Sequence, residues 1–182
     1  GVGFTAEDRA SLLATIDTSA DRLDRVVGNL LDMSRIQSGA TNAILTATAA
    51  EDVVAAALSS IAAPSSRILV DVSEEVPLVL TDGALLERAL ANLVSNALAW
   101  SPLDQPVRIE AATVAGDVQL RVVDRGSGIP RGDRQRMFQP FQRLGDSPSH
   151  GAGVGLGLAV ARGFTRAMGG DLAVDDTPGG GT

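Results

Sequence analysis

The chain has 182 residues, of which 45% are hydrophobic and none is cysteine, so it can bury one core with a smaller appended element and forms no disulfide or thiolate metal site. Its 22 acidic and 15 basic residues give a formal charge of −7, which repels a nucleic-acid backbone, so nucleic acid is not an expected partner. No stretch of the sequence approaches the roughly 20 apolar residues that span a bilayer.

The first predicted element is a long amphipathic helix from Thr5 to about Gln37. Thr5 followed by Asp8 is typical of a capping box, and Ser38-Gly39 is typical of a helix end. The helix would be roughly 50 Å long at about 1.5 Å per residue, so we expect part of its apolar stripe to pack on another helix. The stripe repeats in three- and four-residue steps, as in a coiled coil: Ile16, Ser19, Leu23, Val26, Leu30 and Met33, with Leu13, Ala20 and Val27 beside them.

Residues 38–43 predict a hinge, after which short strands and helices alternate. The mixture of hairpins and helices predicts an α+β fold, a two-layer α/β sandwich, rather than a parallel doubly wound sheet. The predicted strands are Ile44–Thr48, Arg67–Val72, Leu78–Leu80, Val107–Thr113, Val118–Val123 and Asp171–Asp175. The predicted helices are Ala50–Ala62, Gly83–Trp100 behind an N-cap at Asp82, a short piece ending at Phe138, and Val154–Met168.

Three polar or aromatic residues share one face of the predicted helix Gly83–Trp100. Asn92, Asn96 and Trp100 recur every four residues, away from the face of Leu86 and Leu90. Amide oxygens are hard ligands that suit Mg²⁺, and an indole can lie against a nucleobase. The alternative is a solvated helix face with the tryptophan as a core residue.

Two glycine-containing stretches flank a possible lid. Asp124 ends a predicted strand and is followed by Gly126, Gly128 and Ile129. Its carboxylate can accept a hydrogen bond from an exocyclic amine, and the glycines let the backbone come close to a flat ligand. The alternative is a plain turn. A second run leads straight into a helix, where N–H groups can hold phosphate, or it is merely a flexible loop. That run contains Gly153, Gly155, Gly157 and Leu158, and it lacks both the strand of a dinucleotide fold and the Lys-Ser/Thr of a Walker loop.

Phe138 and Phe141 stand between the glycine stretches, before a polar segment at 144–150. Paired phenylalanines can anchor a loop whose continuation closes over a ligand. Arg143 can reach a phosphate or remain a solvated surface side chain, and His150 lacks the partners of a catalytic or metal-binding histidine.

In this order the pieces resemble the nucleotide-binding domain of sensor histidine kinases, within the group that includes gyrase-type ATPases and heat-shock chaperones. Asn92–Ala97 resembles the N box, Asp124–Ile129 the first glycine box, Phe138–Arg143 the F box and Gly153–Leu158 the second glycine box. The resemblance implies ATP and Mg²⁺ as cofactors, with Asn96 as the Mg²⁺ ligand, Asp124 at adenine and Trp100 in place of a stacking tyrosine. The same residues would then make up the ATP site: Asn92, Asn96, Trp100, Asp124, Gly126, Gly128, Ile129, Phe138, Arg143, Gly153, Gly155, Gly157 and Leu158.

The first helix resembles the second helix of the family's dimerisation and phosphoacceptor domain, and residues 30–39 are similar to Kdp-type potassium sensor kinases. We therefore expect residues 1–38 to be that helix and residues 43–182 to be the ATP-binding domain. The resemblance further implies a homodimer, a response regulator as partner and a cytoplasmic location, with membrane attachment only through regions upstream.

Three features depart from the family pattern. No His-Glu/Asp-x-Arg/Lys-Thr-Pro box occurs, so we expect the acceptor helix to lie upstream of Gly1. Ala99 stands where a basic residue is expected, which weakens one phosphate contact. The chain ends at residues 179–182, where the last glycine box would lead into a final strand, so we expect that strand to be missing.

Several functions share such a pocket. The resemblance implies a kinase that donates the γ-phosphate of ATP to a histidine on the upstream helix, for relay to an aspartate of a response regulator. Hydrolases of the group carry a glutamate as general base at the position of Asn92, whose amide cannot accept a proton. A related serine kinase would not need the long helix, and a dimerisation or scaffold module that binds ATP without catalysis is the remaining alternative.

Overall fold

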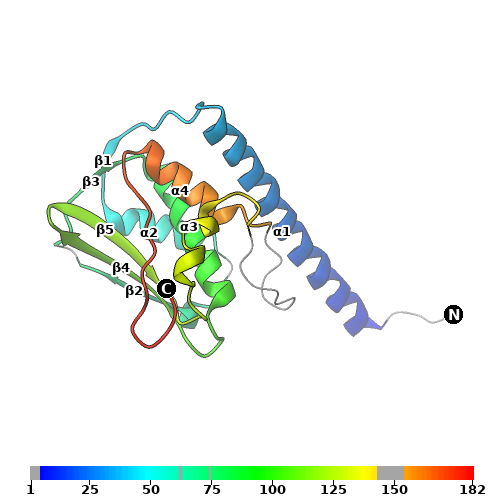
Figure 1. Cartoon of the computed structure of the whole chain (residues 1–182). Coiled ribbons are helices and arrows are strands. Elements are labelled where there is room, and N and C mark those ends of the chain that lie inside the picture. The colour runs from blue at the N-terminus through cyan, green and yellow to red at the C-terminus, as the bar shows by residue number, and fades with distance from the viewer. Residues whose placement is uncertain (1–4, 62, 74, 143–153) are drawn as a thin grey trace.

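The computed structural model describes residues 5–61, 63–73, 75–142 and 154–182, and it has an α+β fold (Figure 1). The order of elements agrees with the predicted order as far as α4, with small shifts at their ends. The helices are α1 (Ala6–Gln37), α2 (Ala50–Ser59), α3 (Gly83–Trp100) and α4 (Gly157–Ala167), with 3-10 turns at Ser65–Arg67, Arg131–Asp133 and Arg136–Phe138. The strands are β1 (Thr46–Thr48), β2 (Ile68–Val72), β3 (Val79–Thr81), β4 (Val107–Val114) and β5 (Asp117–Val123).

The strands form two small sheets. β2 runs parallel to β4, β4 is antiparallel to β5, and β1 and β3 form a separate antiparallel pair. Ala115 and Gly116 join β4 to β5 with φ of 54° and 93°, and positive φ at both central residues is what a two-residue hairpin turn of this kind requires. The register places Ile109 opposite Val122, and the buried residues of β4 alternate with exposed ones, so one face of the sheet is turned to the helices.

Helices α2, α3 and α4 lie together on one side of the longer sheet (Figure 1). Helix α3 takes part in two apolar clusters, because it packs against the sheet and α2 on one side and against α4 on another. The first cluster contains Val53, Val54, Ala57, Leu90, Val94 and Ile109. The second contains Ala89, Val160, Ala161 and Phe164, and this arrangement confirms the two-layer α/β architecture expected from the sequence.

Helix α1 begins with the predicted capping box, in which the Asp8 amide donates to Thr5 Oγ1 at 3.1 Å and the Thr5 amide donates to Asp8 Oδ2 at 2.8 Å. Among the described residues, only its C-terminal part packs on the rest of the chain. Met33 and Ile36 contact the second cluster, and a Cβ on Gly163 of α4 would lie 2.7 Å from Ile36 Cδ1. The two helices therefore touch closely at this point.

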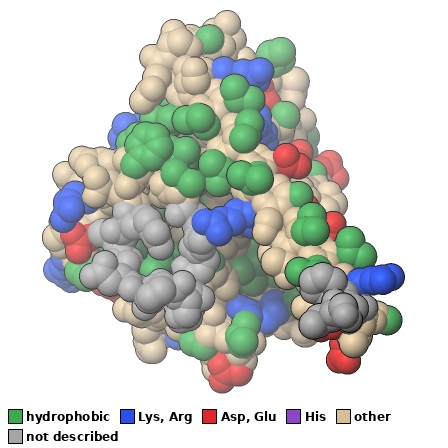
Figure 2. Space-filling model, turned by 90° about the vertical axis from the view of Figure 1, so that its right-hand side faces the viewer, with side chains coloured by type: hydrophobic (Ala, Val, Ile, Leu, Met, Phe, Trp, Pro, Cys, Tyr) green, Lys and Arg blue, Asp and Glu red, His purple; other side chains and the backbone are tan. Residues whose placement is uncertain are grey.

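The remaining length of α1 carries an exposed apolar surface. Its larger stripe residues are between 51% and 63% exposed. Figure 2 shows further apolar side chains gathered across the upper half of the side of the molecule on which α1 lies. This exposure agrees with the expectation that the α/β part of the chain, residues 43–182, does not cover the whole stripe. The exposed stripe residues are Leu13, Ile16, Leu23, Val27 and Leu30.

Two details near the C-terminus differ from the sequence prediction. The strand expected at 171–175 is wrong: Leu172 and Val174 are half-buried between exposed neighbours, but the segment forms no strand ladder with the described residues. Alternation arises from side chains, whereas a ladder needs a second backbone in register. Helix α4 begins at Gly157 rather than at Val154, because Gly155 has a φ of 75°, outside the helical range.

None of the helices within the described ranges has both the length and the apolar character that crossing a bilayer requires.

Candidate functional site

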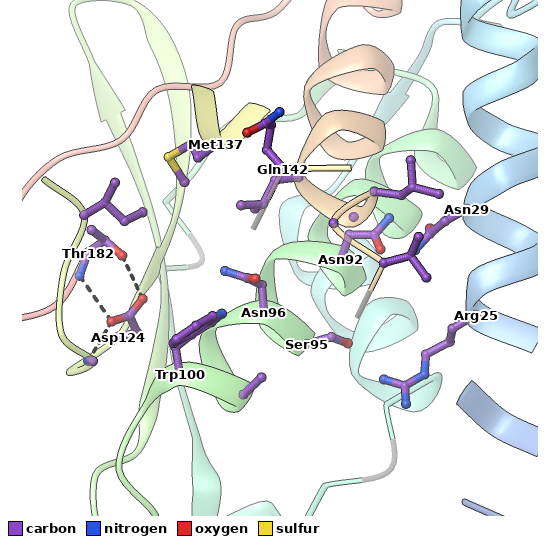
Figure 3. A pocket seen from close by; sticks show the side chains of 18 of the residues that line it. Arg25, Asn29, Asn92, Ser95, Asn96, Trp100, Asp124, Met137, Gln142 and Thr182 are labelled. Carbon is purple, nitrogen blue, oxygen red and sulfur yellow. Dashed lines mark hydrogen bonds between the residues drawn. The ribbon is translucent and has the colours of Figure 1, made fainter. Parts of the chain in front are cut away.

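A cavity of about 300 Å³ lies between α1, α3, the segment after β5 and the start of α4 (Figure 3). Its volume is at the lower end of the range of about 300–1,000 Å³ that is usual for small-molecule sites. Two sets of residues line it. The α/β wall comes from residues 92–182, and the α1 wall consists of Arg22, Arg25, Val26 and Asn29.

Helix α3 forms one side of the α/β wall. It begins at Asp82, whose Oδ1 accepts from the amides of Ala84 and Leu85 at 3.1 Å and whose Oδ2 accepts from the Ile44 amide at 2.9 Å. These hydrogen bonds, the one from Ile44 first, hold the pKa of Asp82 below its usual value. With the helix start fixed, its period places Asn92, Ser95, Asn96, Ala99 and Trp100 on the cavity while Leu90, Val94 and Ala97 are buried.

Asp124 lies at the end of β5 and is only 7% exposed. Its Oδ1 accepts from the amides of Gly126 at 2.8 Å and Thr182 at 3.2 Å, and its Oδ2 accepts from Thr182 Oγ1 at 2.8 Å. A carboxylate has about four acceptor positions, so these three donors leave about one for a ligand. Asp124 also lines the cavity, where Figure 3 shows it beside Thr182 and near Trp100.

The backbone after Asp124 passes very close to the end of α3. A Cβ on Gly126 would lie 2.9 Å from the carbonyl oxygen of Trp100, and the Arg125 amide donates to Ser101 Oγ at 3.1 Å. Glycine at 126 is therefore required by close approach, and glycine at 128 by its φ of 71°. Gly126, Gly128 and Ile129 line the cavity next to the tryptophan, as the sequence pattern suggested.

The second glycine stretch brings the start of α4 to the opposite side. The Phe141 amide donates to the carbonyl of Gly155 at 2.9 Å, and a Cβ on Gly155 would lie 2.5 Å from the Gln142 carbonyl oxygen. The N-cap residue Leu156 has no side chain that can cap the first turn of α4, and no capping hydrogen bond is formed there by the described residues. Its N–H groups and its positive dipole end are consequently available to an anion, and Gly155, Gly157 and Leu158 line the cavity.

The α1 wall was not anticipated from the sequence. Four residues of α1 line the side of the cavity opposite α3: Arg22, Arg25, Val26 and Asn29. Their three- and four-residue spacing keeps them on one flank of α1. Among the described residues of the cavity wall, Arg22 and Arg25 have the only cationic side chains and Asp124 has the only anionic side chain. The spacing of polar residues on this flank was the available signal, but the apolar stripe beside it dominated the pattern.

Some expected site residues are placed elsewhere or not described. Phe138 is not on the cavity wall: the Arg162 guanidinium stacks over its ring at 4.6 Å, and the neighbouring Met137 lines the cavity instead. Arg143, Gly153, the segment 144–150 and His150 lie outside the described residues. The wall also includes residues that were not singled out beforehand: Ser95, Ser127, Met137, Gln142, Val154, Leu156 and Thr182.

Within the described ranges, no group of three or more histidine, cysteine or acidic side chains is placed to hold a metal ion. The hard oxygen ligands on the cavity wall are amides, hydroxyls and one carboxylate. Such a set fits Mg²⁺ only if the ion takes further ligands from water and from a phosphate-bearing ligand, which is its usual behaviour in nucleotide sites.

Comparison with known proteins places these features in a family. The model described as "Histidine kinase-, DNA gyrase B-, and HSP90-like ATPase" matches residues 81–182. The sensor protein KdpD of Mycobacterium tuberculosis (strain H37Rv) is 46% identical over 188 residues, which cover 99% of this chain and 21% of that protein. The sensor-like histidine kinase SenX3 of Mycolicibacterium smegmatis is 35% identical over 167 residues, covering 88% of this chain and 43% of that protein.

A solved structure shares the fold over nearly the whole chain. Full-length ShkA in complex with AMPPNP superposes with a TM-score of 0.72 at 28% sequence identity, covering 99% of this chain and 38% of that one. The chain thus spans less than half the length of each of these three proteins.

Proposed function

The chain belongs to the family of histidine kinase-, DNA gyrase B- and HSP90-like ATPases, and on that premise we propose that it binds Mg-ATP as the nucleotide-binding part of a sensor histidine kinase. In this proposal the γ-phosphate passes to a histidine on another helix and then to an aspartate of a response regulator. The observation that carries the proposal is the arrangement of Asp124, Trp100 and Asn96 around one cavity that ends at the uncapped start of α4.

The adenine end of the nucleotide is proposed to lie at Asp124 and Trp100. The free acceptor position of the buried carboxylate suits an exocyclic amine, and a base lacking that amine would leave the position unpaired. Gly126 and Gly128 let the backbone come close to a flat ring, and the indole of Trp100 offers an apolar surface beside it.

The phosphate end is proposed to lie between Asn96 and the start of α4. Asn96 is the Mg²⁺ ligand of this proposal, and Gly155, Gly157 and Leu158 supply backbone N–H groups to the phosphates. When bound, Mg²⁺ neutralises phosphate charge. Arg143 and Gly153 are proposed to contact the phosphates as well. Phe138 is proposed to belong to the ATP-binding segment, although its ring packs under Arg162 rather than on the cavity wall.

Asn92 favours transfer over hydrolysis in this proposal. Its Oδ1 lies 3.2 Å from the position of a Cβ on Gly157, so it stands directly against the proposed phosphate loop. An amide there cannot take a proton from water, whereas an imidazole nucleophile needs no such base from this domain. The second candidate, an ATP-binding scaffold without catalysis, is favoured by one observation: Ala99 lines the cavity where the family resemblance implies a cation.

We further propose that residues 1–38 act as a dimerisation helix and residues 43–182 as the nucleotide-binding domain. The exposed apolar stripe of α1 supports this division, because two such stripes can cover each other in a homodimer.

Isothermal calorimetry with Mg-AMPPNP tests the binding step, with EDTA and the Asn96→Ala and Asp124→Ala variants as controls. We expect binding that needs Mg²⁺ and that both substitutions weaken by about a hundredfold. Labelled ATP, mixed with the chain and a helical hairpin that carries a phosphoacceptor histidine, tests transfer. Label on the hairpin supports the kinase, binding without transfer supports the scaffold, and absence of heat at high protein concentration refutes both.

A further inference from the structure

We propose that Arg25, with Arg22 beside it, is a polyphosphate-binding residue that α1 supplies to the nucleotide cavity. This inference rests on the proposed function and adds to it a contact from outside the α/β part. The described residues of the α/β wall lack a cationic side chain, and α1 carries a pair of cations that face the same cavity.

The deficit is visible in the composition of the cavity wall. Among the described residues of the α/β wall there is no arginine or lysine, and the position just before Trp100 is the neutral Ala99. A nucleoside triphosphate carries several negative charges, and the whole chain has a formal charge of −7. Backbone N–H groups, one Mg²⁺ and the single arginine of the proposed function, Arg143, leave part of the phosphate charge without a partner.

The α1 wall supplies cations at the required place. Arg22 and Arg25 line the same cavity as Asn96, Ala99 and Gly157, and Figure 3 shows Arg25 reaching from α1 toward α3 near Ser95. Arginine presents a fork of donors that matches phosphate oxygens, so a contact from this side is chemically suitable.

The donors of Arg25 are largely uncommitted. Its Nε donates to the Asp21 carbonyl of its own helix at 3.4 Å, which is a long hydrogen bond. Within the described part of the chain, neither Arg22 nor Arg25 has a carboxylate within ion-pair distance, although α1 carries several acidic residues. The terminal nitrogens can therefore bind an incoming anion without breaking an ion pair.

Contacts further along α1 fix the rotation of the helix about its axis, so that Arg25 faces the cavity. Asn29, Asp32 and Ile36 follow Arg25 in three- and four-residue steps, so they share its flank of α1. Asp32 is 3% exposed and pairs with Arg88 of α3, while Ile36 packs on Gly163 of α4. A helix attached at these points cannot rotate without removing Arg25 from the cavity.

The test compares nucleotides with and without phosphates. Calorimetry on the whole chain would use Mg-AMPPNP and adenosine as probes, with wild type and the Arg22→Ala/Arg25→Ala variant. Charge-assisted hydrogen bonds of this kind correspond to about tenfold in affinity or more, so we expect AMPPNP to bind at least about tenfold more weakly to the variant and adenosine to bind equally. The melting temperature of each variant shows whether it is folded.

Two further variants sharpen the result. Arg9→Ala removes the same charge from an exposed part of α1 away from the cavity, and we expect no change in either affinity. Ala99→Arg, added to the double variant, restores a cation from the α/β wall, and we expect it to recover AMPPNP affinity.

The outcomes separate this inference from the proposed function. Equal AMPPNP affinity for wild type and the double variant, or an equal loss for adenosine, overturns the role of Arg25 while the nucleotide site stands. No AMPPNP binding to the wild-type chain overturns both.

Discussion

The two walls of the cavity differ in how they are held. The α/β wall is built from buried or tightly packed groups: Asp124 accepts three hydrogen bonds, and a Cβ on Gly155 would lie 2.5 Å from the Gln142 carbonyl oxygen. The α1 wall presents exposed arginines on a helix whose attachment lies further along, at Asp32 and Ile36. In the proposed function, base recognition would therefore depend on fixed geometry, whereas neutralisation of the phosphate charge would depend on flexible arginine side chains.

The largest effect is expected from altering the packing of the α/β wall. Gly155→Ala places a Cβ 2.5 Å from the Gln142 carbonyl oxygen at a φ of 75°, and we expect the free energy of unfolding to fall by about 3 kcal/mol. Gly116→Ala is the matched control, because its φ is 93° but nothing lies within 4 Å of the new Cβ; it should cost about 1 kcal/mol. Urea unfolding measures both, and equal losses would contradict the close approach described for Gly155.

The chemistry of the same wall can be removed without disturbing its packing. Asn96→Ala deletes a half-buried amide on the cavity side of α3, and we expect about a hundredfold loss of Mg-AMPPNP affinity, or roughly 2–3 kcal/mol, because an oxygen ligand is lost. Adenosine affinity should change little. Asn42→Ala, an exposed asparagine between α1 and β1, serves as the control for calorimetry. Retained Mg²⁺-dependent affinity in Asn96→Ala would remove Asn96 from the metal site.

The packing of α1 against α3 is expected to depend on the ion pair between Asp32 and Arg88, in which only the aspartate is buried. Asp32 is 3% exposed and Arg88 half-exposed, and Arg88 also lies 5.4 Å from the Phe164 ring centroid. Arg88→Ala leaves a buried carboxylate without a cation and should lower the free energy of unfolding by about 2 kcal/mol at pH 7, discounted because the arginine is partly solvated. Arg108→Ala breaks an exposed pair with Glu110 at 3.6 Å and should cost under about 0.5 kcal/mol.

The pH dependence of the Arg88→Ala effect has a definite sign. Burial already raises the pKa of Asp32, and Arg88 opposes that rise. Without Arg88 the folded-state pKa lies further above the unfolded value, so the folded state binds the proton more tightly and the destabilisation is relieved as the pH falls through the folded pKa. Urea unfolding at pH 7 and pH 4 should show the smaller loss at pH 4, and a loss that grows in acid would contradict the burial of an uncompensated charge.

The smallest effects are expected from removing the residues that cap the N-termini of α3 and α1. Asp82→Ala removes the N-cap of α3 and the bond to Ile44, and we expect a loss of about 1 kcal/mol. Because the folded-state pKa of Asp82 is lowered, its stabilisation is present above the unfolded pKa and is lost as the pH falls through the folded value.

Asp8→Ala is the counterpart at α1, where hydrogen bonds to Thr5 lower the pKa of an exposed Asp8. We expect it to increase amide hydrogen exchange only in the first turns of α1, since the described residues around Asp8 are all exposed. A global loss of stability in Asp8→Ala, or none in Asp82→Ala, would contradict this contrast.

Local patterns were enough to predict much of the fold. Capping residues and apolar periodicity placed α1 and α3 correctly, and the four-residue spacing of Asn92, Asn96 and Trp100 predicted their common face. The prediction failed where a second segment decides the outcome: Asp171–Asp175 alternates like a strand but has no ladder partner among the described residues. Phe138 likewise packs under Arg162 rather than on the cavity.

The sequence by itself determined where helices start and stop, which residues face a core and which short stretches carry glycine, because these depend on neighbours within a few positions. Only the tertiary structure decided that Thr182 donates hydrogen bonds to Asp124 and that Arg22 and Arg25 face the cavity that α3 lines. Both depend on contacts between segments far apart in the chain, and no local period records which partner a side chain will meet.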